Sequence, residues 1–60
     1  MNGEYITIVF KNGEMVTYRP EEYTDYSWRK EIFVVIRDKQ WIGLFSWDQI
    51  SFVTIGEKEE

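Results

Sequence analysis

The chain has 60 residues and a formal net charge of −4, from seven Lys and Arg against eleven Asp and Glu, and it contains neither Cys nor His. One small domain is therefore the upper limit, and disulfides and the usual zinc ligands are excluded as its stabilisers. The acidic balance argues against nonspecific binding to duplex DNA, and the lack of His and Cys removes the commonest general base and the best nucleophile.

The first predicted element is a β-hairpin that spans residues 5–19 and turns at Asn12-Gly13. A two-residue turn would place Ile8 opposite Thr17 and divide the apolar side chains between the two faces. A three-residue loop with Gly13 at positive φ instead gathers four large side chains on one face, so we predict that register. The four are Ile6, Ile8, Val16 and Tyr18, with Ile8 opposite Val16 and Ile6 opposite Tyr18.

The next segment, Pro20–Lys30, is predicted as a long loop, because Pro20 ends the second strand and no clear periodicity follows it. The acidic cluster in this segment is interpreted as a solvated patch that would favour a partner with a basic surface. Its rings and cations are typical of protein interfaces and of single-stranded nucleic acid binders, although rings can also fold back over a small core. The acidic residues are Glu21, Glu22 and Asp25, the rings are Tyr23, Tyr26 and Trp28, and the cations are Arg29 and Lys30.

A nearly continuous apolar run, Glu31–Asp38, predicts a strand that is covered on both faces. One small core covers only one of these faces, so the other would need a partner. We expect a symmetric dimer in which Phe33 and Val35 take part in self-association. The alternative is a sharply bent barrel that wraps both faces within one chain.

The following predicted strand is Trp41–Phe45, in which Gly43 marks a bend or a close backbone approach. If Phe45 points inward, alternation places Trp41 on the same side of the strand. Trp41 is therefore predicted to belong to the core.

A capping-box pattern at Ser46–Gln49 predicts one helical turn before the last strand. Trp47 would be partly exposed there, beside Asp48. The last strand, Ile50–Ile55, is rich in β-branched residues, and residues 57–60 are predicted as a solvated acidic tail.

The stretch Gly43-Leu44-Phe45-Ser46-Trp47-Asp48-Gln49-Ile50 resembles the end of Src-homology-3 domains, where a Gly-Leu-Phe strand runs into a helical turn and a final strand. The resemblance implies a small barrel in which the loop over residues 20–30 lies near the final turn. It does not imply binding of proline-rich peptides, because Ser46 and Gln49 stand where that family has its ligand-binding Pro and Tyr. The order of elements is also similar to that of short bacterial and phage proteins, some of which block host or defence proteins.

Together these features predict an all-β fold: a single domain over residues 1–60, built as a five-stranded, strongly bent antiparallel barrel with one helical turn before the last strand. We expect a non-enzymatic protein without cofactor or metal that binds another protein. The N-terminus lacks the pattern of a signal peptide and no apolar run is long enough to cross a membrane, so we expect a cytoplasmic location. The predicted binding residues are Tyr23, Tyr26, Trp28, Arg29, Lys30, Trp47 and Asp48.

Two other functions remain open at this point. A single-stranded nucleic acid binder would use Trp28 with a stripe of cations, namely Arg29, Lys30, Arg37 and Lys39. A structural subunit of a homo-oligomer would account for the strand that is apolar on both faces. The distribution of charge separates the first from protein binding, because an even mixture of cations and acids favours a protein partner.

Overall fold

The N-terminal hairpin has the predicted register. In the computed structural model, which describes residues 3–56, β1 (Tyr5–Phe10) pairs antiparallel with β2 (Met15–Tyr18). Ile8 lies opposite Val16 and Ile6 opposite Tyr18. Gly13 has a φ of 95°, and its N–H donates to the Phe10 carbonyl over 2.9 Å. The three-residue loop is confirmed, and it turns the fully buried Ile6 and Ile8 and the half-buried Val16 and Tyr18 to one face.

The turn predicts a clear ranking of two substitutions. Asn12→Ala removes a side-chain oxygen that accepts the Glu14 N–H over 2.9 Å, which costs roughly 0.5–1.5 kcal/mol. Gly13→Val forces a β-branched residue into the left-handed region, and we expect a loss of ~1–3 kcal/mol. Urea unfolding of the two variants measures the difference. A larger cost for Asn12→Ala would contradict the role of positive φ in this loop.

The segment predicted as a long loop contains regular structure. It forms a short 3-10 helix, η1 (Pro20–Glu22), and then β3 (Asp25–Trp28), which pairs with β4 (Ile32–Arg37). The loop prediction is therefore wrong over β3. Tyr26 and Trp28 alternate with two polar residues and pack their rings 6.1 and 4.8 Å from that of Phe33. Four residues are too few for this alternation to stand out in the sequence.

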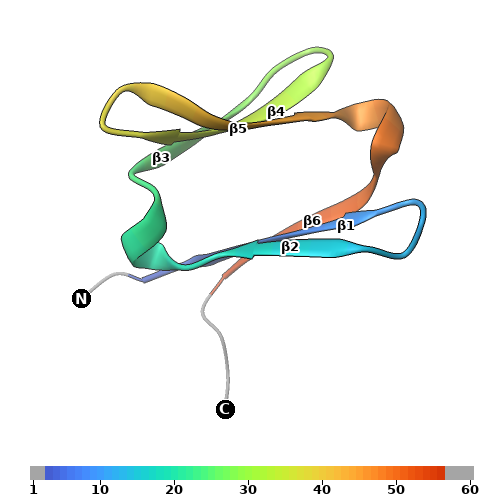
Figure 1. Cartoon of the computed structure of the whole chain (residues 1–60), viewed down its shortest axis with the longest axis horizontal. Coiled ribbons are helices and arrows are strands. Elements are labelled where there is room, and N and C mark those ends of the chain that lie inside the picture. The colour runs from blue at the N-terminus through green and yellow to red at the C-terminus, as the bar shows by residue number, and fades with distance from the viewer. Residues whose placement is uncertain (1–2, 57–60) are drawn as a thin grey trace.

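The remaining elements complete two antiparallel sheets. After β4 come β5 (Gln40–Ser46), a second 3-10 helix, η2 (Trp47–Gln49), and β6 (Ile50–Gly56), so the predicted helical turn before the last strand is present. The Ser46 side chain caps η2 by accepting the Asp48 N–H, which confirms the N-cap half of the capping-box interpretation. The strand orders are β2-β1-β6 and β3-β4-β5, and Figure 1 shows the sheets as two layers joined by η1 and η2.

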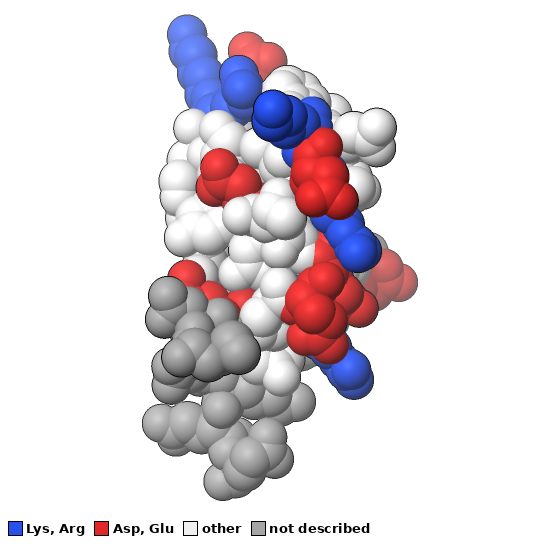
Figure 2. Space-filling view, turned by 90° about the vertical axis from the view of Figure 1, so that its left-hand side faces the viewer, with Lys and Arg blue, Asp and Glu red and all other residues white. Residues whose placement is uncertain are grey.

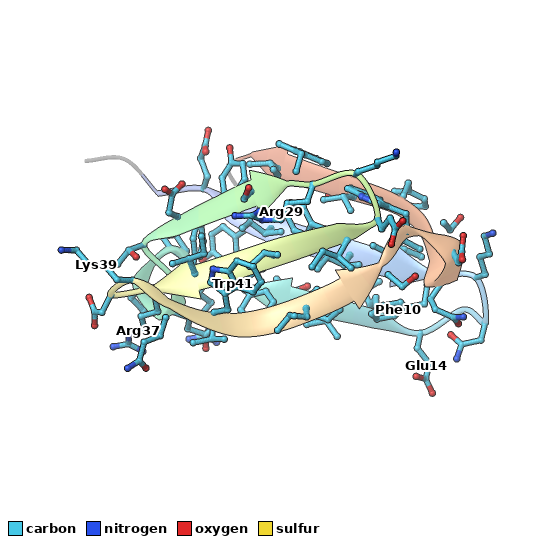
Figure 3. The ribbon with its side chains drawn as sticks, turned by 90° about the horizontal axis from the view of Figure 1, so that it is seen from above. Phe10, Glu14, Arg29, Arg37, Lys39 and Trp41 are labelled. Atoms are coloured by element: carbon cyan, nitrogen blue, oxygen red, sulfur yellow. The ribbon has the colours of Figure 1, made fainter. Side chains whose placement is uncertain are left out.

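The prediction of an all-β antiparallel fold is confirmed, whereas that of a five-stranded, strongly bent barrel is not. Residues 3–56 form six strands in two separate sheets. Seen from above, β6 lies beneath β3 and β2 lies beneath β5 (Figure 3). Side chains connect the layers at these edges: the rings of Tyr18 in β2 and Phe45 in β5 meet edge to face at 6.3 Å. The two sheets do not close into a barrel, because rings pack between them at this edge and no strand of one sheet pairs with a strand of the other.

The core lies between the two sheets. Its fully or nearly fully buried members come from β1, β4 and the start of β6, and they are Ile6, Ile8, Phe33, Val35 and Ile50. Phe33 and Val35 have no exposed surface, so the assignment of self-association to these two residues is wrong. Alternation turns them inward, and it turns the other apolar residues of β4 outward. The strand is apolar on both faces, and on its outward face Val34 is fully buried while Ile32 and Ile36 are half-buried.

A β-bulge in β5 reverses the predicted position of Trp41. Gly43 lies opposite Val35 and Trp41 lies opposite Ile36, so Ile42 is an extra residue in β5. One extra residue shifts the alternation, so that Gly43 faces the core and Trp41 faces outward. Trp41 is 47% exposed, and its assignment to the core is wrong.

Two further predictions concern the tail and the membrane. The acidic tail, residues 57–60, lies outside the described residues. Within residues 3–56, the structure has no helix with the length and apolar composition that crossing a bilayer requires.

Candidate functional site

Trp28 and Trp47, two of the predicted binding residues, stack on each other. Trp28 ends β3 and Trp47 begins η2, and their rings are 5.5 Å apart and parallel to within 4°. The Trp47 Nε1–H donates to the Arg29 carbonyl over 2.7 Å. The Pro20–Lys30 segment and the final turn therefore meet. Trp47 is half-buried by this contact, whereas Trp28 is 55% exposed and offers its ring to solvent.

Tyr23 and Tyr26 cover the core. Both are half-buried, with ring centroids 6.2 Å apart, and Tyr26 also packs on Phe33. The Tyr23 hydroxyl donates to the Glu4 carbonyl over 2.8 Å. For these two rings the alternative interpretation holds, in which loop aromatics fold back over a small core.

Two tyrosines give the fold a predictable response to alkali. Burial raises the pKa of Tyr18 and of Tyr23 above the ordinary value of 10.0, and the nearby Glu22 and Glu4 carboxylates, respectively, raise it further. The folded state holds these protons more tightly than the unfolded chain does. The two protonated tyrosines therefore contribute their full stabilisation of the fold below pH 10. This contribution is lost as the pH rises through their raised pKa values.

We expect the free energy of unfolding to fall above about pH 10 in the natural protein. The Tyr18→Phe, Tyr23→Phe double variant lacks both protons and should show a shallower fall. Urea titrations over a series of alkaline buffers measure both slopes. Identical slopes would show that these two phenols do not control the response.

The acidic residues Glu21, Glu22 and Asp25 serve local structure rather than one site. Glu21 forms an exposed ion pair with Arg19 at 3.8 Å. A Glu22 carboxylate oxygen accepts the Arg19 N–H over 2.9 Å, and an Asp25 oxygen accepts the Tyr26 N–H over 2.7 Å. The described part of the chain holds no cluster of three acidic side chains placed to bind a metal ion.

Lys30 and Asp48 border a shallow hollow at the η2 end of the molecule. It has a volume of about 450 Å³ and is also lined by Glu31, Ile32, Ser46 and Trp47. Lys30 and Asp48 are both exposed. The structure therefore groups Lys30, Trp47 and Asp48, and it places Trp28 against them through the indole stack.

A different set of exposed apolar side chains lies on β5, and the sequence analysis did not select it. Trp41, Ile42 and Leu44 are 47%, 43% and 57% exposed, and we call these three residues the β5 surface. The Arg29 guanidinium lies 4.7 Å from the centroid of a Trp41 ring, so side chains from the two edges of the sheet meet above β4 (Figure 3). Val34, the outward residue at the centre of β4, is fully buried although no third layer of backbone covers this face.

The cations of the described chain do not form a stripe. Arg29 and Lys30 precede β4, whereas Arg37 is its last residue and Lys39 lies in the turn to β5. Arg37 lies 3.9 Å from the carboxylate of Asp38. Figure 2 shows Lys and Arg side chains among Asp and Glu on the side that it presents. This mixture is the pattern that favours a protein partner over a nucleic acid backbone.

Comparison of the chain with protein-family models, with curated proteins and with solved structures finds no match.

Proposed function

We propose that this protein is a non-enzymatic, cytoplasmic protein-binding module whose partner docks on the β5 surface. The observation that carries the proposal is the grouping of Trp41, Ile42 and Leu44, each more than two-fifths exposed, on one strand of a very small domain. Large apolar groups exposed together on a monomer are typical of interaction sites. Trp is also among the residues that contribute most to binding energy in protein interfaces.

Arg29, one of the binding residues chosen from the sequence, supports the same surface. Its guanidinium is held over the Trp41 ring in the free protein. A side chain that already has a preferred position loses less conformational freedom when a partner binds. Arg is a further residue type enriched at the centre of interfaces. Arg29 and Trp41 together would form the anchor of the interface.

The charges around the β5 surface favour a partner with an apolar patch and basic residues beside it. Asp25 pairs with Ile36, and Ile36 pairs with Trp41, so an exposed carboxylate lies in the same row of the sheet. Glu21 and Glu22 lie shortly before it in the chain. Such acids act through steering and specificity more than through affinity. One concrete form of this function is a phage or mobile-element protein that blocks a host or defence protein.

The test compares tagged baits in a lysate of the source organism. The baits are the natural protein, a Trp41→Ser, Leu44→Ser double variant, and Met15→Ser as a matched control. Met15 is 61% exposed but lies on the other sheet. We expect a protein that the natural bait and the control retain to be depleted about tenfold or more on the double variant, which corresponds to ~1.4 kcal/mol of binding energy. Circular dichroism checks that all baits are folded.

Two outcomes would contradict the proposal that the partner binds to the β5 surface. Equal retention by all three baits would show that the partner binds elsewhere. Loss of the partner with Trp28→Ala, but not with the double variant, would move the site to the Trp28–Trp47 stack and its hollow.

The nucleic acid alternative has its own measurement. Fluorescence anisotropy of a labelled oligothymidylate at low salt should show no change on addition of the protein, because its cations are interspersed with acidic side chains, as at Arg19–Glu21 and Arg37–Asp38. Tight binding that weakens steeply with salt would contradict the proposal of a protein partner.

A further inference from the structure

The strand β6 is an edge without the usual protection. Its hydrogen-bonded neighbour is β1, and its irregularity lies at its start, where Val9 faces Phe52 and Phe10 faces Ile50, so that Ser51 is an extra residue. From Phe52 to Gly56 the strand is regular and contains neither Pro nor a charged side chain. Proteins commonly protect an edge with charges, Pro or a bulge, because its free backbone groups otherwise accept another strand.

The outward face of this sheet is also uncharged, in a chain of which 30% is charged. Two rows cross it, Met15–Val9–Phe52 and Thr17–Thr7–Thr54. A molecule with a net charge of −4 repels its own copies, so a contact region free of acidic residues favours self-association. The face around β6 meets this condition.

The outward face of the sheet has a hollow beside the end of β6 and an exposed ring, that of Phe52, near the beginning of the same strand. The hollow has a volume of about 410 Å³, and Tyr5, Thr54 and Gly56 are among the residues that line it. The space above Gly56 is empty, since a Cβ atom added to this residue would have no neighbour within 4 Å. Phe52, on the same face of the strand, is 53% exposed.

Antiparallel pairing of β6 with its own copy brings these two features together. If Thr54 lies on the two-fold axis, Phe52 of each chain stands opposite Gly56 of the other. Each ring then covers the glycine and enters the hollow of the second copy. On the inner face, the half-buried Val53 stands opposite Ile55 of the second copy, so the same register continues the apolar layer.

We infer that the protein forms a two-fold symmetric dimer in which β6 pairs with β6 of a second copy about Thr54. The two β2-β1-β6 sheets become one continuous six-stranded sheet. This inference is independent of the proposed protein partner, because the β5 surface belongs to the other sheet and remains free in the dimer.

Charge substitutions at Thr54 test the symmetry directly. Sedimentation velocity from micromolar to millimolar concentrations should show the natural protein, with a chain mass of 7.3 kDa, associating into dimers. Thr54→Lys and Thr54→Glu each place like charges opposite each other on the axis, and each should raise the dissociation constant about tenfold or more. An equimolar mixture of the two should recover dimers, because Lys then faces Glu. This recovery requires residue 54 of one chain to lie against residue 54 of the other.

Matched controls separate the interface from the fold. Gln40→Lys and Gln40→Glu introduce the same charges at an exposed position at the start of β5, in the other sheet, and should leave the dimer intact. Phe52→Ala should raise the dissociation constant about tenfold, whereas Leu44→Ala, at a 57% exposed position on the other sheet, should not change it. Circular dichroism establishes that the monomeric variants remain folded.

Three results would overturn the inference. The first is a natural protein that stays monomeric at every concentration. The second is a dimer that both Thr54 variants leave intact, or that their mixture fails to restore. The third is a dimer that dissociates on Trp41→Ser, Leu44→Ser, because that result assigns self-association to the β5 surface.

Discussion

Phe33→Ala should leave the chain unfolded at room temperature. Phe33 has no exposed surface, and its ring contacts those of Tyr26, Trp28 and Trp47 at centroid distances of 6.1, 4.8 and 5.8 Å. Truncation of a buried Phe costs ~3–5 kcal/mol through lost transfer energy and the cavity left behind. A single core in a domain of this size supplies only about 3–5 kcal/mol in total. Near-ultraviolet circular dichroism and urea unfolding measure the loss.

Phe52→Ala is the matched control, because it removes the same ring from a site that is 53% exposed. Measured at concentrations at which the chain is monomeric, it should cost less than about 1 kcal/mol. A folded Phe33→Ala protein of nearly natural stability would show that the core that Phe33 forms with Ile6 and Ile8 does not depend on its ring.

Gly43→Ala should destabilise the protein by ~1–3 kcal/mol, because the added methyl group overpacks the space between the sheets. Its Cβ atom would lie 2.5 Å from the Tyr18 hydroxyl oxygen and 2.8 Å from a carbon of the Phe45 ring. Both neighbours belong to the aromatic contact between β2 and β5. The sequence predicted a bend or a close backbone approach at Gly43; the close approach found there is that of two side chains.

A double-variant cycle locates this cost. Tyr18→Phe removes the hydroxyl that the methyl group would meet, so Gly43→Ala should cost less in the Tyr18→Phe background than in the natural protein. Gly56→Ala, where the added carbon has open space, should cost little in the monomer. Additive effects of the Tyr18 and Gly43 changes would contradict the steric explanation. Urea midpoints of the four proteins complete the cycle.

The parts of the fold that were predictable are those in which two independent signals agree. At the first hairpin, the turn residues Asn12-Gly13 and the period-two pattern both require the same register, which the structure has. The capping box at Ser46 and the β-branched residues after Gln49 likewise place η2 and β6 correctly. Local chemistry and burial reinforce each other in these segments.

Trp41 shows why the candidate site was harder to predict. Alternation along β5 is a correct rule, but Ile42 adds one residue, and every side chain before the bulge changes face. No local signal in "WIGLF" identifies the extra residue, because all of its side chains except Gly43 are apolar. The strand β3 was missed for a related reason, since its alternation becomes visible only when Phe33 is known to pack against Tyr26 and Trp28.

The pairing of β1 with β6 determines the order in which the molecule can be assembled. The hairpin β1–β2 and the meander β3-β4-β5 each consist of neighbours in sequence and can form early. The sheet β2-β1-β6 needs contacts such as Ile6 with Ile55, which join opposite ends of the described chain. During synthesis β1 keeps an unsatisfied edge until residues 50–56 have been added, and its pairing with β6 must overcome the entropy of closing nearly the whole chain. Folding of this small protein therefore begins locally but is completed only after translation has passed β6.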